Sequence, residues 1–156
     1  MKKTLFLMAA AAVIFVSGCT SVSHSPAPKP VLPQIDLQPA HAAADKFTAQ
    51  FLSALADNNC KEINTALLTD TVAKNMTQDS FSKYSSGIGK HLGKVVKSVY
   101  VCDLNNPLYR SFIWKLSFER KTAAPESKII AADVLFQVQV VKVDDQYKIL
   151  NFIITR

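Results

Sequence analysis

The sequence predicts an α+β domain in which N-terminal helices pack on an antiparallel sheet of about four strands. Apolar residues recur every three or four positions before Gly93 and every second position after it, which indicates helices followed by strands. Short turns separate the strand segments and favour an antiparallel meander over strands joined by crossovers. Helices first and strands second are typical of α+β domains, in which the sheet packs on the helices.

The first 18 residues have the layout of a secretory signal peptide. Two lysines follow Met1, and an unbroken apolar run extends from Leu5 to Val16. This run is shorter than the roughly 20 residues that a membrane-spanning helix needs. We therefore expect residues 1–18 to direct export and then to be removed.

The next feature is the segment Val16-Ser17-Gly18-Cys19, which resembles the lipobox of bacterial lipoproteins. This resemblance implies cleavage before Cys19 and acylation, palmitate included, of its thiol and its new amine. Each buried CH₂ contributes about 0.8 kcal/mol, so several acyl chains anchor a protein firmly. Thr20 in place of aspartate implies the outer membrane, with the domain facing the periplasm. An ordinary signal peptide followed by an unmodified Cys19 thiol is the alternative.

Residues 19–39 form the predicted lipid-anchored linker. Five prolines and several serines in this segment oppose both helix and central strand. A Pro-rich chain extends by about 3.1 Å per residue, so the linker can hold a domain up to about 60 Å from the lipid. The remaining residues, 40–156, suffice for one globular domain with one hydrophobic core.

Charge and cysteine content narrow the classes of partner. The formal net charge is +6, but the lysines are scattered and form no basic stripe, so no nucleic-acid partner is expected. Cys60 and Cys102 remain when Cys19 carries lipid, and an oxidising periplasm favours a disulfide between them. Two separate buried thiols are the alternative. No histidine near the pair gives a zinc-like spacing, and neither a metal nor a cofactor is expected.

Three helices are expected before Gly93. The first starts near Pro39 and ends at Asp57-Asn58-Asn59, and a second, short helix follows it. A third begins after the capping Thr77 and ends at Gly93, which suits a C-cap. The residues expected to face inward are Ala44, Phe47, Phe51, Leu52, Leu55, Ile63, Ala66, Leu67, Phe81, Tyr84, Ile88 and Leu92.

Four strands are expected after Gly93. The first contains Val95, Val99 and Val101, and a turn at Asp144-Asp145-Gln146 precedes a last strand from Tyr147 to Ile154. The second and third strands alternate apolar with polar residues. Their apolar positions are Phe112, Trp114, Leu116, Phe118, Ala132, Val134, Phe136, Val138 and Val140.

The segments "AADKFTAQFLSALADNN", "FIWKLSFERK" and "VLFQVQVVKVDDQYKILNFIIT" together resemble the nuclear transport factor two-like, or cystatin-like, superfamily. The resemblance covers about residues 40–156. It implies a curved sheet folded around the long first helix, often with a conical apolar pocket. Because large aromatic side chains can fill such a space, we expect a mostly filled core. Residues that would line an open pocket are Phe47, Phe51, Tyr84, Phe112, Trp114 and Phe136.

No catalytic motif can be matched residue by residue. Ketosteroid isomerase-like enzymes of this fold use an Asp base with a Tyr or Asp donor, for which Tyr84, Asp103 and Asp133 are candidates. Asp133 is expected to point outward from its strand, and His91 to lie at the surface of a helix end. No catalytic residue is assigned on this basis.

These patterns favour a non-enzymatic outer-membrane lipoprotein whose periplasmic domain acts as a scaffold for another protein of the cell envelope. Binding of a small apolar molecule is the first alternative. A lipid-anchored enzyme with an acid–base pair in the pocket is the second.

Overall fold

Helices precede strands along the chain, and the predicted α+β class is confirmed. The structure is a computed structural model that describes residues 35–57, 63–121 and 129–155. Its elements are α1 (Leu37–Asp57), the 3₁₀ helix η1 (Thr65–Leu67), α2 (Asp70–Asn75), α3 (Gln78–Leu92), β1 (Lys94–Asn105), β2 (Arg110–Lys121), β3 (Ile129–Val143) and β4 (Gln146–Thr155).

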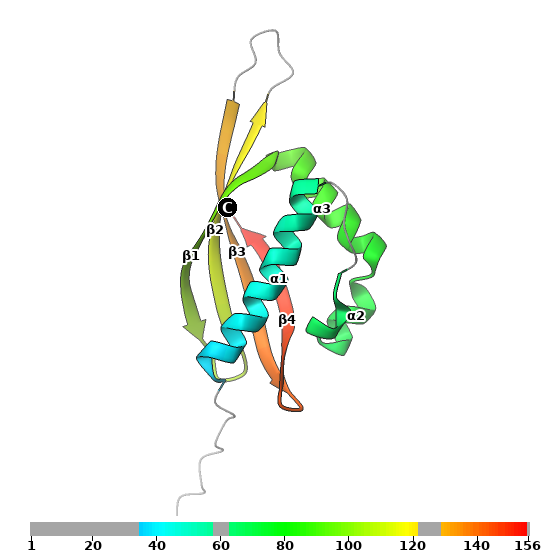
Figure 1. The fold of residues 1–156 in the computed structure, drawn as a ribbon, viewed down its shortest axis with the longest axis vertical. Coiled ribbons are helices and arrows are strands. Elements are labelled where there is room, and N and C mark those ends of the chain that lie inside the picture. Colours follow the sequence, from blue (N-terminus) through cyan, green and yellow to red (C-terminus); the bar gives the residue numbers. More distant parts are fainter. Residues whose placement is uncertain (1–34, 58–62, 122–128, 156) are drawn as a thin grey trace, which may run out of the picture. The chain divides into compact units, whose positions relative to one another are not determined.

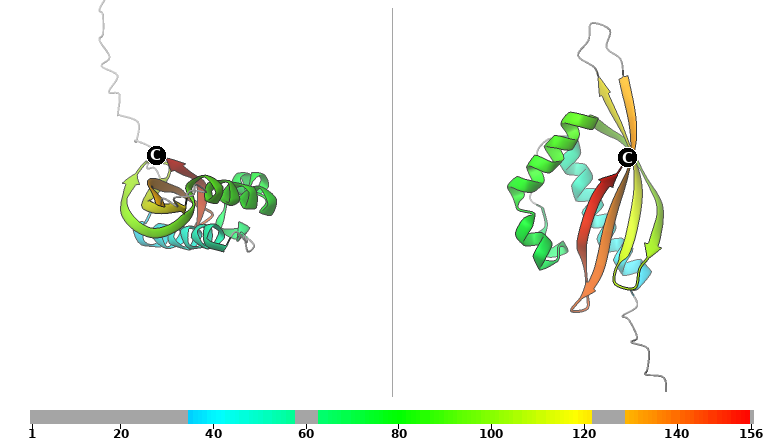
Figure 2. Two further views of the ribbon diagram at one scale, coloured as in Figure 1. Left: turned by 90° about the horizontal axis from the view of Figure 1, so that it is seen from above. Right: turned by 180° about the vertical axis from the view of Figure 1, so that it is seen from behind.

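The four strands form one antiparallel sheet in the order β1-β2-β3-β4. The sheet is strongly curved, and α1 crosses one of its faces while α2 and α3 lie on the β4 side (Figures 1 and 2). Two β-bulges interrupt β1, between Val95 and Lys97 and between Tyr100 and Cys102. Bulges bend a strand and increase its twist, so they account for part of the curl of β1.

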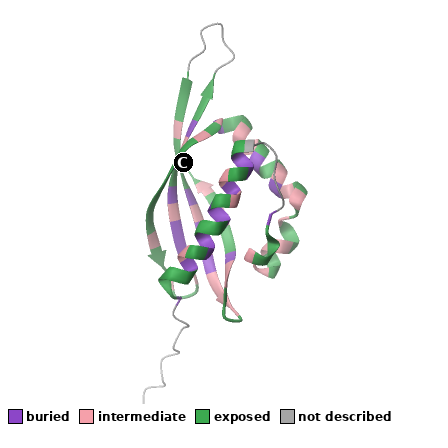
Figure 3. Ribbon diagram, in the orientation of Figure 1, coloured by how far each residue is buried: buried purple, intermediate pink, exposed green. Residues whose placement is uncertain are grey.

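The core lies between the apolar stripe of α1 and the helix-facing side of the sheet (Figure 3). Phe51 of α1 stacks on Phe136 of β3 with ring centroids 4.5 Å apart and ring planes within 6°. Burying an aromatic side chain contributes about 1.5–3 kcal/mol, so this layer dominates the stability of the domain. The largest fully buried side chains are Phe47, Phe51, Phe81, Phe112, Phe118, Phe136, Leu68, Leu116 and Ile149.

Both ends of α3 follow the sequence signals. The Thr77 hydroxyl accepts a hydrogen bond from the backbone N–H of Ser80 at 3.3 Å, which satisfies a donor of the first turn. Gly93 ends the helix with φ +94°, and a Cβ there would lie 2.2 Å from the carbonyl oxygen of Glu119. Only glycine fits this position, because both the backbone angle and the contact exclude a side chain.

The hairpin between β3 and β4 is tighter than the sequence indicated. Val143 already pairs with Gln146, so Asp144 and Asp145 alone form the turn. Their φ angles are +47° and +61°. Positive φ at both central residues is typical of the two-residue turn that matches strand twist, and aspartate tolerates this region without a glycine.

Two details of the chain differ from the expected elements. Helix α1 begins at Leu37, before the predicted domain start at residue 40, and Ile35 already packs into the core. The expected second helix is divided into η1 and α2, because Leu68 between them bridges to Ile149 of β4. Strand β1 forms as expected and contains Val95, Val99 and Val101, but none of its residues is fully buried.

Candidate functional site

The aromatic residues proposed as pocket lining form a filled core. Phe47, Phe51, Phe112 and Phe136 are fully buried, and Trp114 is 5% exposed. Tyr84 lines two grooves, of about 260 and 440 Å³, whereas the other five are buried. The core side chains therefore occupy the space that an open conical pocket would need.

Tyr84 lies on α3 beside the outer edge of β4. Its ring contacts those of Phe51 and Phe152, with centroids 6.2 and 5.8 Å apart. Burial raises the pKa of the Tyr84 phenol, and a hydrogen bond with the Ile154 backbone acts in the opposite direction. The two neighbouring grooves, of about 260 and 440 Å³, are shallow and open to solvent.

The edge of β4 is contacted at two points. The Thr69 N–H donates to the carbonyl of Ile149 at 3.0 Å, and Leu68 forms a parallel bridge to the same residue. Further along the strand, Tyr84 reaches the backbone of Ile154. Proteins commonly protect edge strands in this way, because unpaired backbone groups are a template for pairing with another chain.

The edge of β1 is different. Within the described residues β1 pairs with β2 alone, and its twelve residues are exposed or half-buried along their whole length. Apolar residues are concentrated on it, and one of them, Tyr100, contacts the His41 ring of α1, with centroids 4.7 Å apart. Five of them, Tyr100 included, stay 39–55% exposed, namely Val96, Val99, Tyr100, Val101 and Leu104. We call this unpaired side of β1 the open edge.

A groove of about 350 Å³ lies beside the start of the open edge, where α1 and α3 end. Its walls combine apolar and cationic groups from five elements and the residue that caps α3. Among the described residues, no ion pair involves Lys94, Arg120 or Lys121, which contribute its positive charge. The groove, called here the distal groove, is lined by Leu55, Ala56, Gly89, Gly93, Lys94, Val96, Glu119, Arg120, Lys121 and Ile129.

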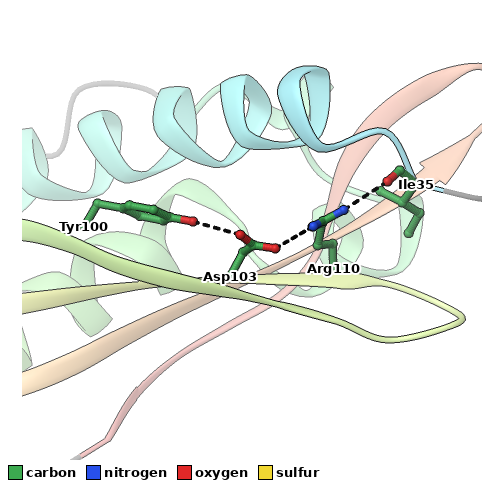
Figure 4. Close-up of polar contacts among 4 residues, drawn as sticks. All are labelled: Ile35, Tyr100, Asp103 and Arg110. Carbon is green, nitrogen blue, oxygen red and sulfur yellow. Dashed lines mark hydrogen bonds and ion pairs between the residues drawn. The ribbon is translucent and has the colours of Figure 1, made fainter.

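A polar cluster occupies the other end of β1 (Figure 4). The Nε and a terminal nitrogen of Arg110 each lie 2.7 Å from one Asp103 carboxylate oxygen, and the Tyr100 hydroxyl donates to the other at 3.3 Å. Arg110 also donates to the carbonyl of Ile35 at 3.3 Å. Burial and the Asp103 charge raise the pKa of Tyr100. Asp103 orients the Arg110 guanidinium, and Arg110 holds the Ile35 carbonyl just before α1; we call Tyr100, Asp103 and Arg110 the clamp.

Tyr147 of β4 holds the same segment from the opposite side. Its hydroxyl donates to the Asp36 carboxylate at 3.0 Å and accepts from the Asp36 N–H at 3.3 Å. Nearby, the His41 ring stacks on Phe112 with centroids 5.2 Å apart. The start of α1 is thus attached to both β2 and β4, and the chain enters the domain at a fixed point.

The structure does not bring the three acid–base candidates together. Asp103 belongs to the clamp, Tyr84 to the β4 edge, and Asp133 lies exposed on the outer face of the sheet. Lys115 at 2.6 Å and Ser117 at 2.7 Å bind the Asp133 carboxylate and lower its pKa. His91 is exposed in the last turn of α3. In the described residues, no group of three or more metal-binding side chains occurs.

The predicted lipidation and disulfide involve residues that are only partly described. Cys19 and Cys60 lie outside the described residues. Cys102 is an exposed, free cysteine. In the sheet register it lies opposite Ile113 of β2, on the side of the sheet away from the core. The disulfide therefore stays a prediction. No helix within residues 35–57, 63–121 and 129–155 is long and apolar enough to cross a membrane.

No family model and no curated protein matches the sequence. Solved structures similar to it at low identity include the following two. The intermembrane-space region of the chloroplast protein ARC6 is 11% identical, with a TM-score of 0.45, over 78% of this chain and 98% of that one. A protein named NTF2-like transpeptidase from Campylobacter jejuni is 12% identical, with a TM-score of 0.36, over 69% of this chain and 97% of that one.

Proposed function

We propose that this protein is a non-enzymatic scaffold of the bacterial cell envelope, an outer-membrane lipoprotein whose periplasmic domain docks a partner protein along the open edge of β1. The sequence Val16-Ser17-Gly18-Cys19 supports the location. The difference between the two edges of the sheet supports the docking role, and this is the observation on which the proposal depends.

An exposed apolar strand edge favours pairing with another chain. Added strands gain backbone hydrogen bonds from the edge and specificity from side chains placed alternately along it. The β4 edge is contacted at Ile149 by Leu68 and Thr69 and at Ile154 by Tyr84, whereas Val99 and Val101 of β1 are 43% and 52% exposed. Among the described residues β1 pairs with β2 alone, which suits a domain that docks another strand along β1.

The position of the clamp also suits a tethered scaffold. Arg110 and Tyr147 fix the chain at Ile35 and Asp36, within the last residues of the predicted linker. Helix α1 has 21 residues and is about 31 Å long at 1.5 Å per residue. The distal groove, at the far end of α1, is therefore presented away from the point where the linker joins the domain.

A photo-crosslinking amino acid placed on each edge tests the docking role. In intact cells, a probe at Val101 is expected to give a discrete adduct with one envelope protein, and a probe at Val96 to give the same adduct. A matched probe at the exposed Thr155 of β4 should give none. Adducts of equal yield from both edges, or none from β1, would contradict the proposal.

The anchor is tested separately by fractionation. Cys19→Ser removes the thiol that the acyl chains would occupy, and the protein is expected to leave the membrane fraction. A Cys102→Ser variant is the matched control and should stay with the membranes. Persistence of the Cys19→Ser protein in the outer membrane would rule out a lipid anchor at this residue.

A second candidate function is binding of a small apolar molecule, which the distal groove favours. Leu55, Val96 and Ile129 give it apolar walls. Lipid that copurifies with the membrane-extracted protein, and is lost in Val96→Glu, would support this function. Mass spectrometry after organic extraction measures it.

A further inference from the structure

The charge around the open edge points to the chemistry of its partner, and this inference rests on the proposed docking function. Four cations surround the first half of β1, namely Lys94, Lys97, Arg120 and Lys121, against the carboxylates of Glu119 and Asp133, and Asp133 is already bound by Lys115. Within the described part of the chain, none of the four forms an ion pair. This end of the edge therefore has an excess of positive charge.

The two sides of the edge offer different surroundings. Lys97 pairs with Ser117 and acts electrostatically on Asp133, so it lies on the outer face of the sheet. The distal groove lies on the helix side, with Leu55 and Ala56 of α1 in its wall. Successive side chains of an added strand point to opposite faces. One set would meet Lys97, and the other would meet the apolar wall of the groove.

We propose that the partner binds β1 as an extended segment of alternating acidic and apolar side chains, which adds a fifth strand to the sheet. Its carboxylates lie beside Lys97 on the outer face of the sheet, and its apolar side chains enter the distal groove on the helix side. A groove of about 350 Å³ is large enough for one or two side chains. Backbone hydrogen bonds to β1 supply the remaining contacts.

A second copy of the chain is a poorer occupant. It would bring the same excess of lysine and arginine to the edge, and like charges across an interface oppose association. The carboxylate of Asp103, further along β1, is already neutralised by Arg110 at 2.7 Å. An acidic partner would be attracted to this end of the edge, whereas a second copy would be repelled from it.

A synthetic peptide tests this inference with the lipid-free, full-length mature chain. The probe is a fluorescein-labelled ten-residue peptide of alternating Glu and Val, and its control has Lys in place of Glu. Fluorescence anisotropy should show at least tenfold tighter binding of the Glu peptide, with the preference reduced at high salt. N-methylation of alternate peptide nitrogens should abolish binding, because it removes the strand hydrogen bonds.

Charge reversal identifies the surface. Lys97→Glu combined with Arg120→Glu is expected to weaken binding of the Glu peptide at least tenfold, whereas Lys148→Glu on β4 should leave it unchanged. Circular dichroism checks that each variant is folded. Equal loss in both variants, or no loss in either, would overturn the inference.

The remaining outcomes each contradict the inference in a distinguishable way. Equal binding of the Glu and Lys peptides would refute acidic recognition but leave the open edge as a docking site. A dimer at micromolar concentration that Val101→Pro dissociates would assign the edge to a second copy. Displacement of the peptide by dodecanoate, together with loss of the Val101 crosslink in cells, would refute both the inference and the scaffold function.

Discussion

The clamp at the start of α1 gives the sharpest stability prediction. Arg110 binds the Asp103 carboxylate through two nitrogens at 2.7 Å, and the two side chains are only 17% and 24% exposed. Charge-assisted hydrogen bonds contribute about 1.5–3 kcal/mol, and breaking a fully buried pair costs about 3–5 kcal/mol. Because this pair is partly accessible, Arg110→Met should lower the free energy of unfolding by about 2–3 kcal/mol.

A double-mutant cycle separates the interaction energy of Arg110 with Asp103 from the energy of the other contacts of Arg110. Asp103→Asn and Arg110→Met together should cost about 1–2 kcal/mol less than the sum of the single changes. Urea unfolding of the chain from residue 31 onwards, followed by Trp114 fluorescence, measures each variant. Lys115→Met is the control. The ion pair between Lys115 and Asp133 is as short, at 2.6 Å, but its side chains are 49% and 55% exposed. Lys115→Met should therefore change the free energy of unfolding by no more than about the experimental error.

The refuting result is a small effect without coupling. If Arg110→Met costs no more than Lys115→Met, and the cycle shows additive changes, then Arg110 and Asp103 do not act as a pair in solution. The attachment of Ile35 through Arg110 would then have to be abandoned as the device that fixes the start of α1.

Three further predictions follow from single features of the structure. Gly93→Ala places a Cβ 2.2 Å from the Glu119 carbonyl at φ +94°, and should cost at least about 2 kcal/mol in urea unfolding; a change below about 0.5 kcal/mol would show that β1 starts differently. Because the pKa of Tyr84 is raised, the folded state retains the phenol proton at a pH where the unfolded state loses it. The contribution of Tyr84 to the free energy of unfolding is therefore fully present below pH 10 and is lost as the pH rises further. The absorbance titration of the protein at 295 nm should lose part of its later-titrating component in Tyr84→Phe, because Tyr100 also has a raised pKa and supplies the remainder, and an unchanged curve would contradict the burial. Alkylation of the unfolded, unreduced periplasmic protein should leave Cys60 and Cys102 unmodified if they are bridged, and two modified thiols would exclude the disulfide.

The sequence predicted the helical core and the two central strands well for a definite physical reason. Phe47, Phe51 and Leu55 recur at helical spacing because one stripe of α1 contacts the sheet. Strands β2 and β3 alternate cleanly because one face packs on α1 and the other meets solvent. Where only one face of an element is buried, the spacing of its apolar residues along the sequence reveals the type of element.

The clamp could not be predicted, because a bulge changes which residues share a face. Tyr100 and Asp103 are three positions apart, and in a regular strand they would point to opposite sides. The extra residue between Tyr100 and Cys102 brings both side chains to the helix side, where Asp103 meets Arg110. Nothing in the local sequence marks this insertion.

The sequence also did not predict the open edge or the distal groove. The open edge depends on which strand lacks a neighbour in the fold, and the groove depends on residues far apart in the sequence. The valines of β1 predict a strand, but only the tertiary structure shows that the edge of β4 is contacted and that, among the described residues, β1 pairs with β2 alone. The groove combines Leu55, Gly89, Val96 and Arg120, which come from separate elements. Among the expected pocket residues, Tyr84 lies at two grooves, whereas the others are buried in the core.

Amide hydrogen exchange along β1 tests the central claim most directly. In the isolated chain, the β1 amides that do not bond to β2 should exchange nearly as fast as those of an unstructured peptide, whereas the amide of Thr69, bonded to Ile149, should be protected. Saturating partner, or the alternating Glu and Val peptide, should then protect the β1 amides between Lys94 and Val101 without changing those of β4. Protection of all β1 amides in the isolated monomer, or none gained on binding, would contradict docking at the open edge.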